Sequence, residues 1–435
     1  MNGRSRAAKV GRFLGAGAFL AAVAFVLTIF CAGRAEAVPA FSRELKTECT
    51  TCHTIFPQLN EFGEAFEKNG FVWPGAVPMS KKVKVTQTEE ERKSAEFIYL
   101  SGIPAVLPLA VSLSGSYVYN KKAEDDFNMK NYGAELFAAG AFGGDRIGFW
   151  FNESLGNQDT KANNSLTGPS QVYFVARNPL GVPVNLKAGK FSPDLTLWKT
   201  TLNGRMLSMG ASAGGFSVTG AQAGLELSTI LASRVQAVVG VNDRNNATGK
   251  DADGKEFSPH SVNDYYGRIG AKFGGTDYHG KEPDIDLDKD SVWDYLSISV
   301  SAFGYSGTTS KGDGVDHDVN RLGVESEVAY KKARLMLGAT FGENDAETDD
   351  PLKSTALSAE LDYVFNAVYA VALRYDNLDV DGKDNQTRIT PGIIYAPLQC
   401  FKLRLSAAID SNPTNADTGK AVANTTVTLA ATMSF

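Results

Sequence analysis

Cysteine, histidine and charged side chains are all scarce in this sequence. Its 435 residues include 4 cysteines and 4 histidines, and 21% of the residues are charged. Cys31 belongs to a leader segment and Cys400 stands alone, so a framework of structural disulfides is excluded. No second C-x-x-C is present to complete a structural zinc site. Catalytic triads, phosphate-binding loops and dinucleotide-binding motifs are missing too, and the enzyme classes that depend on them find no support.

The first 37 residues have the pattern of an export signal. A basic start precedes an apolar stretch at 13–32, and Ala35-Glu36-Ala37 offers small residues for cleavage. We expect a signal peptide at 1–37, whose removal changes the net charge from −6 to about −10 and argues against nucleic acid as a partner. A retained membrane anchor is the alternative, because the apolar stretch is long. Phe30 is too bulky for a lipoprotein signal before Cys31.

Cys49-Thr50-Thr51-Cys52-His53 is the most informative stretch of the chain. C-x-x-C-H is the attachment signature of a c-type haem. We therefore expect Cys49 and Cys52 to hold one covalent haem c through thioethers and His53 to ligate its iron from one side. A redox dithiol or half a zinc site shares the cysteine spacing, but the adjacent histidine and the expected export argue against both.

A short helix is predicted after this motif, within a haem segment at 38–92. Leu59, Phe62 and Phe66 recur at helical spacing, and this apolar stripe is expected to pack on the haem. Pro57 suits the first turn of the helix, and Asn69-Gly70 a C-terminal stop. The segment is too small for a core of its own, so the haem or the rest of the protein must supply apolar contacts.

The second axial ligand of the iron stays open at this point. Met79 is a possible distal ligand, as in His/Met cytochromes, or else a surface residue of a mobile stretch. His260, His279 and His317 are far along the chain and are expected to be solvated. An iron with an open coordination site is the remaining alternative.

From about residue 106 the apolar pattern has a period of two, in a sequence with 43 glycines, 25 phenylalanines and 15 tyrosines. At 424–435 the alternation is clearest, and the stretch ends on an aromatic residue, Phe435, as bacterial outer-membrane barrels do. Charged residues on the second face of such strands fit a polar lumen, whereas a soluble sandwich would bury the apolar face. Strand lengths of about ten residues favour the membrane. Aromatic residues predicted for an interfacial girdle are Tyr330, Tyr363, Phe365, Tyr369, Tyr395 and Phe401.

After a linker at 93–105, the sequence thus predicts an all-β fold, a transmembrane outer-membrane β-barrel of about sixteen strands at 106–435, preceded by the small helical haem segment. The expected strands are 106–119, 130–142, 145–156, 169–177, 183–192, 217–228, 231–243, 261–274, 294–307, 317–330, 333–343, 353–366, 368–378, 385–396, 399–411 and 424–435. An even number of strands returns both ends to the periplasm.

Short and long connections alternate between these strands, as they do in bacterial barrels, where short turns face the periplasm. The expected tight turns are Gly143-Gly144, Thr229-Ile230, Lys331-Lys332 and Asn366-Ala367, and the expected long loops include 244–260, 344–352 and 412–423. The connection at 275–293 breaks the rule, because it is long but falls on the short-turn side. The longest outer loop, 193–216 with Trp198 and Met206, is a candidate to fold into the lumen.

Two groups of acidic residues are candidate ion sites. The alternating aspartates at 284–290 resemble the start of a calcium loop, but Lys289 stands where an EF-hand needs glycine, so a solvated loop is favoured. Acidic residues at 345–350 and at Asp379, Asp381 and Asp384 make the outer loops negative. They serve solubility and lipopolysaccharide contact through divalent ions, or else they attract cations such as Fe²⁺.

The N-terminal residues also carry a resemblance to a known family. Val38-Pro-Ala-Phe41-Ser-Arg43, the C-x-x-C-H motif, and Pro57, Leu59, Phe62-Gly63, Phe66 and Asn69-Gly70-Phe71 together resemble the fused monohaem cytochrome–porins of the bacterial outer membrane. The resemblance implies one haem attached at Cys49 and Cys52 with His53 as axial ligand, a barrel of this size, and oxidation of extracellular Fe(II). Glu44 departs from the glutamine that members often have, and over the barrel the resemblance is architectural only.

We therefore expect an outer-membrane electron-transfer protein with Fe(II)-oxidising activity. Its haem segment would lie on the periplasmic side or in the lumen, and would pass electrons from extracellular Fe(II) to a periplasmic cytochrome or another carrier. Two alternatives remain: electron export to an external acceptor, and a diffusion porin whose haem segment is a periplasmic plug.

Overall fold

A computed structural model describes the chain in separate stretches, all within one compact unit, Val38–Phe435. The described residues are 51–55, 58–72, 109–120, 127–142, 146–157, 170–197, 220–243, 262–280, 296–310, 316–344, 351–366, 368–382, 385–398, 401–411 and 425–434. Within them, no helix is long and apolar enough to cross a membrane.

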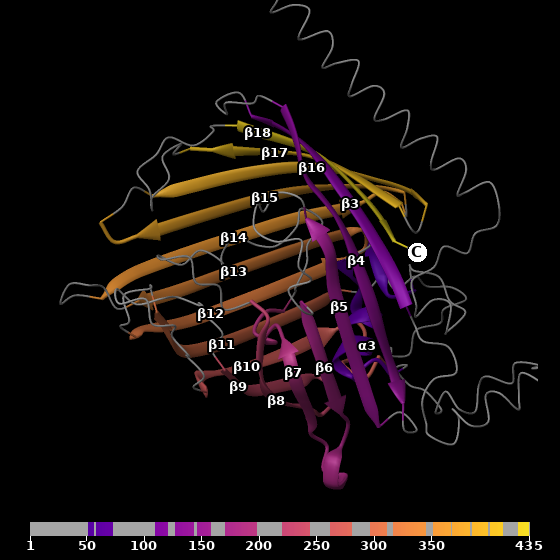
Figure 1. Cartoon of the computed structure of the whole chain (residues 1–435), viewed down its shortest axis with the longest axis vertical. Coiled ribbons are helices and arrows are strands. Elements are labelled where there is room, and N and C mark those ends of the chain that lie inside the picture. Colours follow the sequence, from indigo (N-terminus) through magenta and orange to yellow (C-terminus); the bar gives the residue numbers. More distant parts are fainter. Residues whose placement is uncertain are drawn as a thin grey trace, which may run out of the picture. The chain divides into compact units, whose positions relative to one another are not determined.

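Sixteen antiparallel strands form a closed barrel in which each strand pairs with its neighbours in the sequence (Figure 1). Its strands are Leu109–Asn120 (β3), Phe127–Phe142 (β4), Ile147–Asn157 (β5), Gln171–Ala176 (β6), Asn185–Phe191 (β7), Gln222–Leu231 (β8), Val235–Asp243 (β9), Val262–Gly274 (β10), Ser297–Ser310 (β11), Asp316–Tyr330 (β12), Ala333–Asn344 (β13), Leu352–Val364 (β14), Tyr369–Val380 (β15), Gln386–Leu398 (β16), Phe401–Asp410 (β17) and Thr425–Ser434 (β18). The last strand closes the barrel on the first, with Ser434 opposite Ser112. A short 3₁₀ helix, Pro179–Gly181 (η3), connects β6 and β7.

All sixteen predicted strands are confirmed, and one predicted turn is wrong. Thr229-Ile230 lies inside β8, and the tight turn comes later, at Ala232–Arg234. Ala232 and Ser233 adopt positive φ angles of 47° and 56°, and Arg234 N donates to Leu231 O over 3.1 Å. A left-handed turn of this kind matches the twist of paired strands, but it is usually signalled by glycine or asparagine, which this turn lacks.

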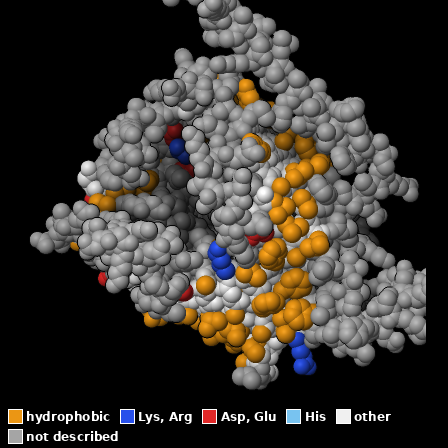
Figure 2. All heavy atoms as spheres, viewed as in Figure 1, with side chains coloured by type: hydrophobic (Ala, Val, Ile, Leu, Met, Phe, Trp, Pro, Cys, Tyr) orange, Lys and Arg blue, Asp and Glu red, His pale blue; other side chains and the backbone are white. Residues whose placement is uncertain are grey.

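The barrel is apolar outside and charged inside. On the outer wall, about half of the surface of many apolar residues is exposed, for example 59% for Ile269, 50% for Val324 and 49% for Leu361. On the opposite face of the same strands, the inward side chains are buried and carry charge, among them Arg268, Lys272, Glu325, Glu327, Glu360 and Asp362. Figure 2 shows hydrophobic side chains over the outer wall and charged side chains inside the hollow. A soluble protein buries its apolar residues and exposes its charged ones, and this barrel does the opposite. The arrangement confirms a transmembrane barrel with a polar lumen.

The length of the strands matches a membrane. On β14 the outward face runs from Lys353 at the long-loop end to Tyr363 at the short-turn end, about ten residues, which at about 3.3 Å each and a tilt of about 40° span about 25 Å. Exposed aromatic rings gather at the short-turn end: Tyr363 and Phe365 meet at 4.9 Å between centroids, and Tyr369 and Tyr395 stack at 5.1 Å. Tyr330 is exposed there as well, whereas Phe401, also predicted for this girdle, is buried.

The described part of the N-terminal segment is a small folded motif. His53–Ile55 (β1) pairs antiparallel with Gln58–Leu59 (β2), and the helix Glu61–Lys68 (α3) follows. The helix begins at Glu61 rather than near Pro57, because Asn60 is its N-cap and accepts from Gly63 N over 2.9 Å. It ends at Lys68, with Asn69 as its C-cap and Gly70 at a positive φ of 69°, so the predicted stop at Asn69-Gly70 is confirmed.

Candidate functional site

The structure describes part of the predicted haem site. Cys52 and His53 are both half-buried, and His53 pairs with half-buried Leu59 across β1 and β2. Cys49 and Met79 lie outside the described residues, as do the acidic stretches at 284–290 and 345–350.

Backbone contacts hold the end of the C-x-x-C-H motif against the start of α3. Asn60 N donates to Cys52 O over 2.9 Å, and its side-chain amide donates to Thr51 O over 3.1 Å. A side chain at Gly63 would not fit, because a Cβ there would lie 2.1 Å from Cys52 O. The glycine that follows Phe62 is therefore required by the close approach of two backbones.

Glu61 ties α3 to the end of β10. Its Oε1 lies 3.2 Å from Lys272 Nζ, and its Oε2 accepts from Thr276 N over 2.8 Å. Burial acts to raise the pKa of Glu61, but the charge of Lys272 and hydrogen bonds from Ser297 and Thr276 outweigh burial and hold this pKa below 4.5. The carboxylate is therefore kept charged at the contact between segment and barrel.

Arg334, the second residue of β13, binds the segment at two points. Its guanidinium donates to Leu59 O over 2.9 Å and lies 3.4 Å from Glu64 Oε1. The same group contacts Glu327 of β12 at 2.5 Å. Burial and the nearby Glu327 carboxylate raise the pKa of Glu64 above 4.5. Arg334 thus lies between two buried carboxylates, one from the segment and one from the wall.

Two further contacts join the segment to the wall. Gln58 Nε2 donates to Asp362 Oδ2 of β14 over 2.8 Å, and Asn69 Nδ2 donates to Tyr278 O over 2.8 Å. Tyr278 belongs to the long connection after β10, which the alternation of short and long loops did not explain. Residues 275–280, the described start of this connection, line the docking site of α3.

Apolar contacts complete the docking on both sides of the segment. Phe66 and Phe71 belong to a buried cluster with lumen residues of the wall, and Phe71 stacks on Trp150 of β5 with 5.6 Å between ring centroids. On the other side, Ile55 packs with Ile394 of β16 and its neighbours. The barrel therefore supplies apolar contacts that a segment of this size lacks. Phe66 meets the barrel wall, while Leu59 and Phe62 remain half-buried beside the motif.

Residues 193–197, the described start of the loop predicted at 193–216, turn into the lumen, and 198–216 lie outside the described residues. Arg268 of β10 donates to Asp194 O over 3.0 Å and pairs with its carboxylate at 3.1 Å. Leu197 N donates to Glu325 of β12 over 2.7 Å. Leu195 is fully buried. Ser192–Leu197 thus narrows the lumen beyond the helix, while Trp198 and Met206 lie outside the described residues.

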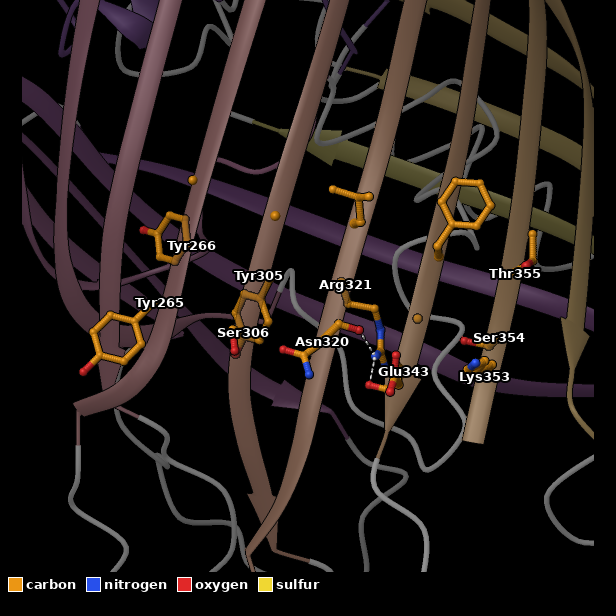
Figure 3. A pocket seen from close by; sticks show the side chains of 15 residues that line it. Tyr265, Tyr266, Tyr305, Ser306, Asn320, Arg321, Glu343, Lys353, Ser354 and Thr355 are labelled. Atoms are coloured by element: carbon orange, nitrogen blue, oxygen red, sulfur yellow. Dashed lines mark hydrogen bonds between the residues drawn. The ribbon is translucent and has the colours of Figure 1, made fainter. Parts of the chain in front are cut away.

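The hollow in Figure 3 is an indentation of the barrel wall near the long-loop end. Its lining alternates between outward residues such as Tyr265 and Leu322 and inward ones such as Tyr305 and Arg321. Arg321 bonds the backbone carbonyls of Asn320 and Glu343, at 2.6 and 3.3 Å. No separate substrate site is indicated there.

Of the remaining histidines, two lie within the described residues. His279 is half-buried in the docking connection, with its backbone N bonded to Asp277 Oδ1 over 2.9 Å, and His317 lies in β12. His260 is outside the described residues. Among the described residues, no group of three or more histidine, cysteine or acidic side chains is arranged to hold a metal ion.

The described donor groups fit the haem that the motif implies. A c-type haem needs two thiols, an imidazole ligand and an apolar surface. Cys52 and His53 are adjacent and half-buried rather than enclosed, and Leu59 pairs with His53 in the neighbouring strand. Sequence reasoning missed Lys272, Arg334 and Asp362 as docking residues. Their only signal was a charge on the lumen face of a strand near its short-turn end.

Comparison with known proteins identifies the fold. No protein-family model matches the sequence, and no curated protein sequence matches it either. Among solved structures, an anion-selective porin from Comamonas acidovorans has 14% sequence identity and a TM-score of 0.53, over 76% of this chain and 99% of the porin. The outer membrane channel DcaP of Acinetobacter baumannii has 13% identity and a TM-score of 0.49, over 75% and 96%. The chain has a porin fold. About a quarter of the chain has no counterpart in the Comamonas porin.

Proposed function

We propose that this protein is an outer-membrane cytochrome–porin that takes electrons from extracellular Fe(II) and passes them to a periplasmic cytochrome or another carrier. In this proposal Cys49 and Cys52 hold one haem c, His53 ligates its iron, and Met79 is a candidate for the opposite ligand. The barrel would lie in the bacterial outer membrane, where this fold occurs, with its short turns toward the periplasm.

One observation carries the proposal: the segment that continues the C-x-x-C-H motif is docked inside a membrane barrel. Glu61, Glu64 and Gln58 each bond a different strand of the lumen wall near the short-turn end. A segment fixed in this way keeps whatever it carries within the wall of the membrane rather than free in the periplasm. An electron crossing an apolar band about 25 Å tall needs a carrier inside it.

The chain's own residues would set the conditions of transfer. A bound haem would supply one-electron redox chemistry. His53 would hold the iron, and Leu59 and Phe62 would limit the access of water to one face. Lys272 and Arg334 fix the orientation of α3, and with it the position of Cys52 and His53. Ser192–Leu197 restricts the lumen from the other direction, and so limits how solutes reach the motif.

A diffusion porin with a haem-bearing plug is the second candidate, and the porin fold of the barrel favours it. In that case the lumen would conduct small solutes and the haem would not exchange electrons with the outside. Outward transfer to an external acceptor is the third candidate, and it shares the path of the first.

The test begins with the purified full-length protein in detergent. Covalent haem is measured by its pyridine complex, with the Cys49→Ala/Cys52→Ala variant as the control that should lose it. The oxidised protein is then mixed with Fe(II) at neutral pH in a stopped-flow spectrometer. We expect rapid appearance of reduced haem bands. Reduction by dithionite but not by Fe(II) would contradict iron oxidation. Solute flux through wild-type proteoliposomes would instead support the diffusion porin.

A further inference from the structure

The burial of inward side chains differs from one side of the lumen wall to the other. Inward side chains of β10–β15 are buried, whereas those of β17, β18 and β3 are mostly half-buried. These last three strands are neighbours in the sheet (Figure 1). The described contacts of the docked segment run from β5 to β16, through Phe71 at one limit and Ile55 at the other. The sector from β17 to β3 therefore continues the lumen beside the segment.

Two cations on the lumen face of β17, Lys402 and Arg404, form no ion pair with an acidic side chain among the described residues. Lys402 makes no hydrogen bond or ion pair with the residues that the structure describes, and Arg404 is the charge that acts on it. Arg404 Nε is buried without a hydrogen bond to the described residues, and the Glu360 carboxylate acts on Arg404 through its charge. Like charges two residues apart on one face repel each other, and a partly desolvated cation without a counter-ion is costly. An anion bound between Lys402 and Arg404 would offset both the repulsion and the cost of desolvation.

The pair lies next to the part of the wall that bears the segment. Arg404 is opposite Ile394 in the register of β16 and β17. Ile394 is fully buried and belongs to the same hydrophobic cluster as Ile55, which lies two residues after His53. Lys402 follows the short connection between β16 and β17, so it lies at the same end of the barrel as the docked segment.

Small side chains continue the sector away from the pair. Arg404 is opposite Ala430 of β18, which is opposite Ser116 of β3. Lys402 is followed in the same way by Thr432 and Ser114. Ser116 Oγ is buried and has no hydrogen-bond partner. The wall here thus combines two cations, a hydroxyl donor and short side chains, a combination suited to a flat ligand with anionic groups.

We propose that Lys402 and Arg404 bind the two propionate carboxylates of the haem. The inference rests on the proposed function, because it requires a haem attached at Cys49 and Cys52. Carboxylates are the anionic groups of a haem, and a charge-assisted bond to an ammonium or a guanidinium stabilises them in a partly buried site. Lys402 and Arg404 are positioning residues in this scheme. They hold the haem against the lumen wall and place positive charge beside it.

The chain offers a matched control in Arg321. This residue also faces the lumen, and its Nη2 is buried without a hydrogen-bond partner. It lies toward the long-loop end of β12, ten residues before the short turn at Lys331-Lys332. Neutralising Arg321 removes one lumen cation at a distance from the motif.

The test compares haem-loaded full-length proteins: wild type, Lys402→Gln/Arg404→Gln, the charge-conserving Lys402→Arg/Arg404→Lys, and Arg321→Gln. Loss of nearby positive charge favours the ferric state. We therefore expect the neutral double variant to keep its haem content, to show a lower reduction potential, and to shift the propionate bending bands in resonance Raman spectra. The charge-conserving variant and Arg321→Gln should keep the wild-type values. If the double variant does not fold, Lys402→Gln alone is measured.

An unchanged potential and unchanged propionate bands in the haem-loaded neutral variant would overturn the pairing and leave the proposed function intact. An equal shift in Arg321→Gln would also overturn it, because the effect would then be a general response to lumen charge. A wild-type protein without covalent haem would refute the proposed function itself, and the pairing with it.

Discussion

Replacing Arg334 by methionine should release the N-terminal segment from the barrel. The substitution keeps much of the side-chain length but removes the bonds to Leu59 O and Glu64 and the contact with Glu327. It leaves two carboxylates facing each other, in side chains that are 15% and 8% exposed. Solvent screens such groups little, so the loss exceeds that of a surface pair.

The size of the effect follows from this geometry. Removing one partner from a buried ion pair costs about 3–5 kcal/mol. Part of this cost stays with Glu327 whether the segment is docked or not, so we assign about 3 kcal/mol to docking. At about 1.4 kcal/mol for each factor of ten, the docked population should fall roughly a hundredfold relative to the open one. Acidification should reduce the defect, because the facing carboxylates then share a proton.

Hydrogen exchange measured by mass spectrometry tests this on the folded protein in detergent. Amides of α3, such as Glu64 N bonded to Asn60 O and Asn69 N bonded to Ala65 O, should exchange roughly a hundredfold faster in Arg334→Met. Strand amides should not change. Arg388→Met is the control, since Arg388 pairs with Asp410 at 2.7 Å and no contact joins it to the described part of the segment, 51–55 and 58–72. Wild-type exchange of α3 in Arg334→Met would refute the role of this ion pair.

Three further changes have defined outcomes. Because the pKa of Glu61 is lowered in the folded state, the stability that its carboxylate contributes is present above pH 4.5 and is lost as the pH falls through the folded pKa. Hydrogen exchange of the α3 amides should therefore become faster on acidification. Glu61→Gln should show a smaller increase. Gly63→Ala should disrupt the segment and reduce haem attachment, because a Cβ there meets a backbone carbonyl, whereas Gly115→Ala, where the space is open, should not. Arg268→Met should free Asp194, and with it the inturned loop, from the β10 wall and increase single-channel conductance in planar bilayers. An unchanged conductance would mean that the loop does not limit the lumen.

The barrel was predictable because two environments constrain each strand: lipid requires apolar residues on one face, and the water-filled lumen allows charged residues on the other. Apolar residues such as Leu361 and charged ones such as Glu360 alternate along β14 with the period of the pleat, and tilt and strand length follow from the thickness of the membrane. The turn after β8 was misplaced, since Ala232 and Ser233 carry no turn signature. The start of α3 was placed too early, because Gln58 and Leu59 pair back onto β1 instead of entering the helix.

The docking contacts were beyond sequence reasoning for a different reason. Glu64 and Arg334 are 270 positions apart, and Gln58 and Asp362 are 304 apart. Alternation shows that Arg334 and Asp362 face the lumen, but not which of the many inward charges meets the segment. That choice depends on the closed geometry of the whole barrel. The motif Cys52-His53 was visible at once, because its residues are neighbours in the chain.

The closure of β18 on β3 has a consequence for how the molecule is made. The segment precedes every barrel strand in the chain, yet its contacts run from β5 round to β16, and the seam between Ser112 and Ser434 joins the two strands that are made first and last. Because the closed barrel surrounds the N-terminal segment, the simplest order of assembly has the segment in place before β18 pairs with β3. The segment can therefore act as a template around which the strands pair, so that closure of the barrel and docking of the segment occur in one folding step.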